Sequence, residues 1–97
     1  MEQSDYIAER IDAGAHLLPP YMADSAKRYI LKGIPPGSFL TAVICNDLRE
    51  AFARADDTNA AMMHNWVRFF YNHAPCGCWG SPEAYADWLA SFRVKAA

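Results

Sequence analysis

Three side chains near residue 75 are of the types that bind metal ions. His73, Cys76 and Cys78 lie close together in the sequence, and Cys45 or His64 could supply a fourth ligand. Zinc takes thiolate and imidazole ligands in a tetrahedral arrangement. Paired zinc cysteines are usually separated by roughly two to four residues, whereas a single glycine separates Cys76 from Cys78. The spacing therefore favours reduced cysteines packed as small apolar side chains, and we predict no metal and no cofactor.

The same residue types could also form the active site of a thiol-dependent enzyme. A cysteine needs a neighbouring base or positive charge to form a thiolate at neutral pH, and His64 and His73 are the candidate bases. The sequence contains no identifiable third group that would orient such a base. We therefore predict no catalytic residue and a protein that is not an enzyme. A small metal- or thiol-dependent enzyme is the alternative.

Two pairs of carboxylates are the other candidates for acid–base chemistry. Asp47 and Glu50 are one helical turn apart, and Asp56 and Asp57 are adjacent at an expected helix start. A carboxylate at the first turn of a helix accepts hydrogen bonds from free backbone amides and is stabilised by the helix dipole. Helix capping and solvation explain both pairs without catalysis.

The aromatic residues suggest binding rather than chemistry. They make up 13% of the chain, and we do not expect a domain of this length to bury all of them. Trp, Tyr and Arg are the residue types that most often anchor protein interfaces. A protein interface is therefore predicted at the end of the fourth helix and in the turn that follows, formed by Arg68, Tyr71, Asn72, His73 and Trp79. A purely structural role for these residues is the alternative.

Apolar residues that recur every three or four positions predict helices throughout the chain. We expect a single all-α domain spanning residues 1–97, a small orthogonal bundle of about five helices. The expected helices cover residues 5–18, 20–32, 38–55 and 58–73, followed by a last helix from Pro82.

The helix expected over residues 38–55 is the predicted centre of the bundle. Pro35, Pro36 and Gly37 form a turn before it, and Ser38 is its expected N-cap. The helix that starts near Asp56 or Asp57 is expected to pack against it. Its apolar side is formed by Phe39, Leu40, Val43, Ile44, Leu48, Ala51, Phe52 and Ala55.

Charge and composition narrow the classes of partner and compartment. The formal net charge is −2, with acidic and basic residues interspersed, which disfavours direct binding of nucleic acid. The first twenty residues are too polar for a signal peptide, and no stretch is apolar enough to span a membrane. Three cysteines, an odd number, are best explained as reduced thiols in a cytosol.

Several short motifs occur together between Gly33 and Leu89. The strings GIPPGSFLTAVICNDLREAFARADD and WVRFFYNHAPCGCWGSPEAYADWL contain a PPGSFL turn, ND and RAD pairs, a YN dipeptide and a WGSPE turn. With these motifs the segment resembles a family of small uncharacterised proteins encoded by bacteriophages and prophages. The resemblance implies a phage protein in the host cytoplasm, and it brings no catalytic residues.

By its size and setting the chain also resembles anti-CRISPR proteins. This resemblance implies a viral accessory protein that binds and inhibits a host defence or regulatory complex by steric occlusion. The expected partner is a host protein or ribonucleoprotein complex, with no direct contact to nucleic acid or membrane, and a homodimer is a further possibility. About 800 Å² per partner suffices for a stable interface. A self-associating structural module is another alternative.

Overall fold

The computed structural model describes residues 3–96, which form seven α-helices, two short 3-10 helices and no strand. The predicted all-α class is thereby confirmed. The α-helices are α1 (Gln3–Gly14), α2 (Pro20–Lys32), α3 (Ser38–Ile44), α4 (Leu48–Arg54), α5 (Asp57–Ala61), α6 (Met63–His73) and α7 (Pro82–Ala96). The 3-10 helices are η1 (Ala15–Leu17) and η2 (Cys76–Cys78). None of the described helices is long and apolar enough to cross a membrane.

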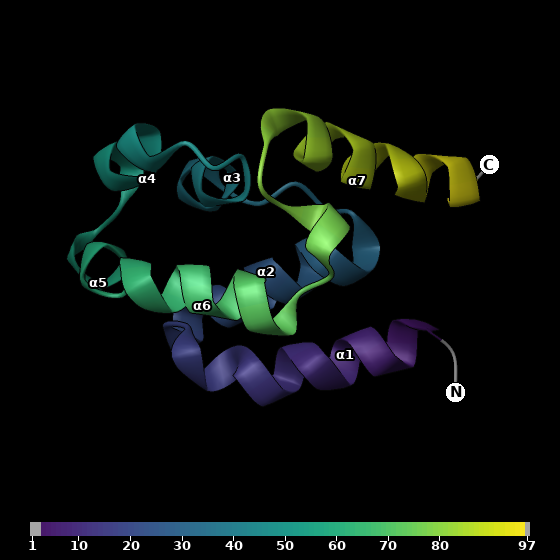
Figure 1. Ribbon diagram of the computed structural model, residues 1–97, viewed down its shortest axis with the longest axis horizontal. Coiled ribbons are helices and arrows are strands. Elements are labelled where there is room, and N and C mark those ends of the chain that lie inside the picture. Colours follow the sequence, from purple (N-terminus) through teal and green to yellow (C-terminus); the bar gives the residue numbers. More distant parts are fainter. Residues whose placement is uncertain (1–2, 97) are drawn as a thin grey trace.

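Helix α6 lies in the middle of the bundle. Figure 1 shows α1 along one side of α6, α3, α4 and α7 along the other side, and α2 behind it. Helix α6 packs against α1, and α3 packs against both α4 and α7. The chain therefore surrounds α6 with other helices and leaves one of its sides facing the viewer.

The core is built around aromatic residues of α6. Trp66, Phe69 and Phe70 are fully buried. The Trp66 ring lies edge-on to Phe39 of α3, with the ring centroids 5.7 Å apart. Its indole nitrogen Nε1 donates a hydrogen bond to Oδ1 of the buried Asn59, at 3.0 Å. A buried polar atom without such a partner costs free energy, so this bond allows the tryptophan to sit in an apolar core.

Hydrogen bonds from distant parts of the chain hold η2 and α7 against the core. The Tyr29 hydroxyl of α2 donates to the backbone carbonyl of Cys78, at 2.7 Å. The amide of Gly80 donates to the carbonyl of Ile44, at 2.8 Å. The Trp88 indole of α7 donates to the carbonyl of Tyr29, at 3.3 Å. The turn between α6 and α7 is thus fixed to the ends of α2 and α3.

The prediction of a single helix over residues 38–55 is wrong, because the chain forms α3 and α4 with a sharp turn between them. Asn46 has a left-handed backbone with φ of 61°, a conformation that asparagine tolerates better than most residues. Asp47 then caps α4, since its Oδ1 accepts a hydrogen bond from the Glu50 amide at 3.1 Å. The turn reorients α4, and Leu48 and Phe52, predicted to face the core, are 65% and 49% exposed.

The helix expected over residues 58–73 is also divided, into α5 and α6, with Met62 between them. These two divisions account for seven helices where about five were expected. The expected cap at Asp56 or Asp57 is confirmed at Asp56, whose Oδ1 accepts from the Asn59 amide at 2.7 Å. Ser38 is not the N-cap of α3: Gly37 holds that position in an extended conformation, and Ser38 is the first residue of the helix.

Candidate protein-binding surface

Three of the five residues predicted to form an interface lie on the exposed side of α6. Arg68, Tyr71 and Asn72 are exposed, and Tyr71 is 78% exposed, the highest fraction among the large apolar side chains. Val67, one helical turn before Tyr71, is 46% exposed. The exposed side of α6 therefore presents an aromatic and an aliphatic side chain next to a guanidinium group.

His73 lies on a different side of α6 and is half-buried. Its ring is so close to Gly14 of α1 that a Cβ atom added there would lie 2.3 Å from the His73 Cγ. The ring also stacks on Phe69, with the centroids 6.3 Å apart. The guanidinium of Arg10 donates to the carbonyl of Asn72 in the same region. His73 therefore packs α6 against α1, and it lies apart from Tyr71.

Trp79 is half-buried and stacks on Phe70, with the ring centroids 5.6 Å apart. Trp79 also borders a cavity of about 140 Å³ that is open to solvent, here called the α4–α6 pocket. Trp79 thus connects the aromatic core to the surface. The pocket is lined by Ala42, Val43, Asn46, Asp47, Leu48, Ala51, Met63, Val67 and Trp79.

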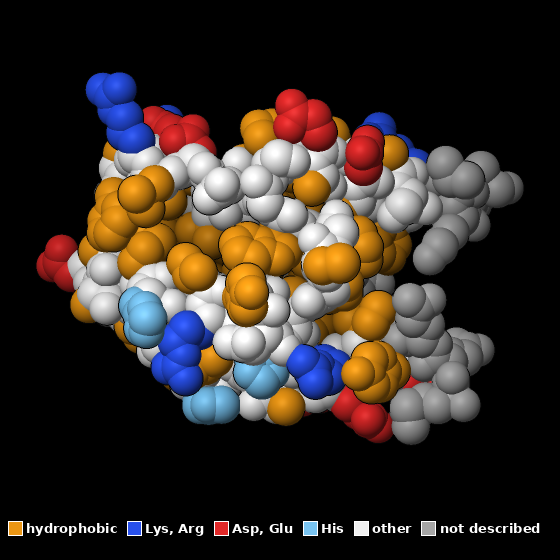
Figure 2. All heavy atoms as spheres, viewed as in Figure 1, with side chains coloured by type: hydrophobic (Ala, Val, Ile, Leu, Met, Phe, Trp, Pro, Cys, Tyr) orange, Lys and Arg blue, Asp and Glu red, His pale blue; other side chains and the backbone are white. Residues whose placement is uncertain are grey.

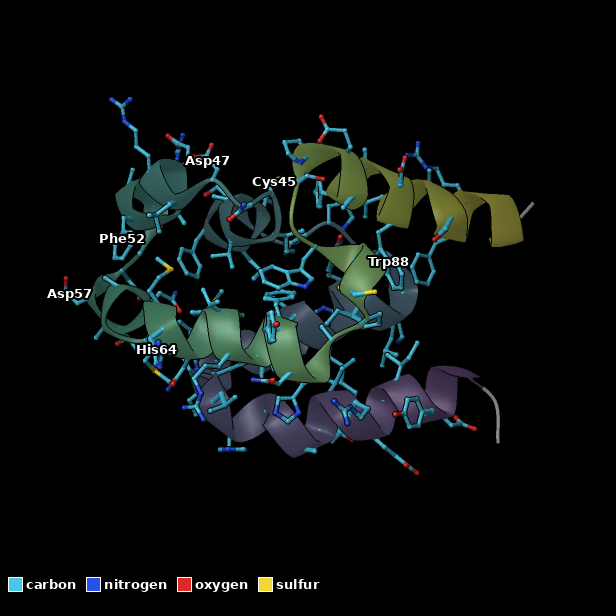
Figure 3. The ribbon with its side chains drawn as sticks, viewed as in Figure 1. Cys45, Asp47, Phe52, Asp57, His64 and Trp88 are labelled. Atoms are coloured by element: carbon cyan, nitrogen blue, oxygen red, sulfur yellow. The ribbon has the colours of Figure 1, made fainter. Side chains whose placement is uncertain are left out.

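Four exposed apolar side chains lie on the two helices that border this pocket, and two of them, Leu48 and Val67, line it. Leu48 and Phe52 come from α4, and Val67 and Tyr71 come from α6. We call these four residues the apolar face. Figure 2 shows hydrophobic side chains forming a continuous band between these helices, and Figure 3 shows Phe52 on the side of α4 that faces α5 and α6. The other exposed large apolar residues, Tyr6, Tyr21 and Ile34, belong to other elements.

Sequence reasoning left Val67 out of the predicted interface, and it also missed Leu48 and Phe52, the two residues of this surface on α4. The spacing of apolar residues from 38 to 55 is regular, and it assigned both side chains to the core. The signal that could have revealed them is the Asn46–Asp47 pair, since asparagine favours a left-handed turn and aspartate favours a helix start. Together these two preferences mark a helix break.

The cysteines and histidines do not form a metal-binding cluster. Among residues 3–96, no group of three or more His, Cys, Asp or Glu side chains is placed so as to hold an ion. Cys78 is buried, and burial raises the pKa of its thiol to about 12. Burial also raises the pKa of Cys45, and the negative charges of Asp47 and Glu83 raise it further. These two thiols are therefore protonated at neutral pH, while Cys76 is exposed.

The carboxylate pairs have the structural roles that capping predicts. Asp47 and Asp56 cap α4 and α5, and Glu50 pairs with Arg54 at 3.2 Å on the surface of α4. The Tyr21 hydroxyl donates to Asp56 Oδ2. This bond, together with backbone amides, lowers the pKa of Asp56.

The fold and this surface define a small all-α protein with an exposed apolar face beside a pocket. Comparisons with protein families, with curated proteins and with solved structures find no match to this chain.

Proposed function

We propose that this protein acts by binding another protein through the apolar face. Following the resemblance to phage proteins, the proposed partner is a host defence or regulatory complex, which the bound chain inhibits by steric occlusion. The observation that supports binding is that Leu48, Phe52, Val67 and Tyr71, all close to half exposed or more, lie on the two helices that border one pocket, which Leu48 and Val67 line. Exposed apolar side chains that gather in this way mark interaction sites, whereas scattered ones are ordinary.

The pocket has the size and chemistry of a site for one apolar side chain. Its volume is about 140 Å³, and an engineered apolar cavity of roughly 150 Å³ binds benzene. Met63 and Val67 of α6, together with Trp79, line one side of the pocket. An aromatic or branched side chain of a partner that entered this pocket would be shielded from water by Leu48 and Val67, which line it. Shielded contacts of this kind dominate the binding energy of protein interfaces.

The enzyme alternative has less support from the site. The raised pKa values of Cys45 and Cys78 leave Cys76 as the thiol most accessible for reaction. It lies with Arg10 and His73 in a cleft of about 420 Å³ between α1 and the end of α6. An enzyme of this kind would lose activity on Cys76→Ser without unfolding, whereas a binder through the apolar face would keep its activity.

Affinity purification with a matched pair of variants tests the proposal. Val67→Asp places a charge on the apolar face at a position 46% exposed, and Ile34→Asp places the same charge in the α2–α3 loop at a position 44% exposed. The tagged wild type and Ile34→Asp should retain the same host complex in a bacterial lysate, and Val67→Asp should retain about tenfold less or none, because a buried unpaired charge is costly. Quantitative mass spectrometry measures the retained complex.

Inhibition is tested on the complex that is captured. Purified wild type and Ile34→Asp should lower its activity at near-stoichiometric concentration, and Val67→Asp should not. Equal retention of a host complex by wild type and Val67→Asp would place binding elsewhere on the protein. Recovery of no host complex by the folded wild type would overturn the inhibitor role.

A further inference from the structure

We infer that the apolar face is also the contact between two copies of this chain, related by a two-fold axis that runs along the α4–α6 pocket. This inference goes beyond the proposed function and does not depend on it. It rests on how charge is distributed on the two sides of the apolar face and on the size of the surface around it.

The α6 side of the apolar face is basic. Helix α6 contains no Asp or Glu, and its exposed His64 and Arg68 are one turn apart. On a helix they form the row next to Val67 and Tyr71. Neither side chain forms an ion pair within the described residues. Within residues 3–96, the Arg68 guanidinium donates one hydrogen bond to a side chain, the amide oxygen of Asn65, at 3.4 Å.

The opposite side of the apolar face is acidic. Asp47 lines the pocket at the start of α4. Glu83, in the first turn of α7, lies close enough for its charge to act with that of Asp47 on the Cys45 thiol. Figure 3 shows Asp47 and His64 on opposite sides of the band between α4 and α6. Of the basic residues on α4, Arg54 is paired with Glu50.

The remaining basic residue of α4 does not cancel this charge. Within α4, Arg49 lies about 60° around the helix from Phe52, at 100° per residue. It therefore adds one positive charge near this edge, where Asp47 and Glu83 supply two negative charges. The net charge of this edge of the apolar face therefore stays negative.

A two-fold axis along the pocket brings these opposite edges together. Rotation by 180° about this axis places the α6 edge of one copy against the α4 and α7 edge of the other. Arg68 then faces an acidic edge twice in the dimer, once from each copy, and the two apolar faces meet between these contacts. A two-fold dimer needs one surface that is complementary to itself, and this surface has that property.

The surface available for such a contact is small. The chain extends 38 by 26 Å in the plane of the view in Figure 2, which shows the apolar face. A standard interface uses about 800 Å² per partner, and weak ones use less. The apolar face and its charged edges together reach this range only if most of the visible surface takes part. We therefore expect a weak dimer with a Kd in the micromolar range, which a tighter partner could replace on the same face.

Sedimentation equilibrium of the untagged full chain tests the inference. Between about 5 and 500 µM, the average mass should rise from the monomer mass of 10.9 kDa toward twice that value. Val67→Asp should weaken dimerisation at least about twentyfold, because two charges would be buried in each dimer. Ile34→Asp should leave the Kd unchanged. Circular dichroism melting curves establish that both variants are folded.

The charged edges are tested by a double-mutant cycle. Arg68→Gln and Asp47→Asn each remove a charge, and asparagine retains the capping function of Asp47. Each variant should weaken the dimer by about fivefold, since exposed ion pairs contribute modestly and each occurs twice. The double variant should be weaker than wild type by less than the product of the two effects.

Two outcomes would overturn the inference. A wild type that stays monomeric at 500 µM has no such contact, and the apolar face would then be left for a different protein, so the proposed function would still stand. A dimer that Val67→Asp does not weaken uses another surface. Loss of the host complex from the affinity experiment would instead affect only the proposed function.

Discussion

Helices α4 and α6 both contain large apolar residues four positions apart, but the two pairs compared below differ in their burial. In α6, Trp66 and Phe70 are four residues apart and fully buried. In α4, Leu48 and Phe52 have the same spacing and are largely exposed. The turn at Asn46 separates α4 from the helix that reaches the core. Apolar spacing therefore predicts an amphipathic helix, and the tertiary arrangement decides whether its apolar side is covered.

The largest effect that follows from this comparison is expected at Phe70. Its ring is fully buried between Trp66 and Trp79, with centroid distances of 6.3 and 5.6 Å. Phe70→Ala removes these contacts and leaves a cavity, which should lower the free energy of unfolding by about 3–5 kcal/mol. Urea denaturation followed by circular dichroism measures the change. A loss below about 1 kcal/mol would mean that Phe70 is not in a packed core.

A smaller effect is expected at the turn that separates α3 from α4. Asn46→Val forces a β-branched residue to a φ of 61°, which should lower the free energy of unfolding by about 1–3 kcal/mol. Asn46→Gly should change it by less than about 1 kcal/mol, because glycine adopts this conformation without strain. Urea denaturation of both variants provides the comparison. If valine were tolerated as well as glycine, residues 38–55 would form one continuous helix in solution.

The sequence predicts local features of this molecule better than it predicts the tertiary arrangement of the helices. The all-α class and the cap at Asp56 follow from local preferences, and both are observed. Tyr71 at the end of α6 is exposed, as expected for some of the aromatic residues there, and its role in an interface stays a prediction. The exposure of Leu48 and Phe52 could not be derived from spacing, because it depends on the direction of α4 after the turn. Of the four residues of the apolar face, only Tyr71 was among those predicted to form an interface.

Phe52 provides the direct counterpart of Phe70, since both are phenylalanines on helices that border the pocket region. Phe52→Ala removes a side chain that is 49% exposed, and alanine favours the helix. The free energy of unfolding should fall by about 1 kcal/mol or less. The same variant should weaken self-association in sedimentation experiments. A loss as large as that of Phe70→Ala would show that Phe52 is buried in solution.

The smallest effect is expected from a surface contact between α2 and α5. The Tyr21 hydroxyl donates to Asp56, which lowers the pKa of this carboxyl from its ordinary value of 3.8. A lowered pKa in the folded state stabilises the protein above the unfolded-state value, and this stabilisation is lost as the pH falls through the folded-state value. Tyr21→Phe should therefore lower the melting temperature slightly at pH 6, and the difference from wild type should shrink below pH 4.

Tyr6→Phe is the matched control, because Tyr6 is 57% exposed and Tyr21 is 58% exposed. Removing the Tyr6 hydroxyl should give a melting temperature difference that does not depend on pH between 6 and 3. Both side chains lie on the solvated surface, where water and salt screen charges, so the pH-dependent part for Tyr21 should be far smaller than the loss at Phe70. If Tyr21→Phe had the same effect at pH 6 and pH 3, the bond to Asp56 would not link α2 to α5 in solution.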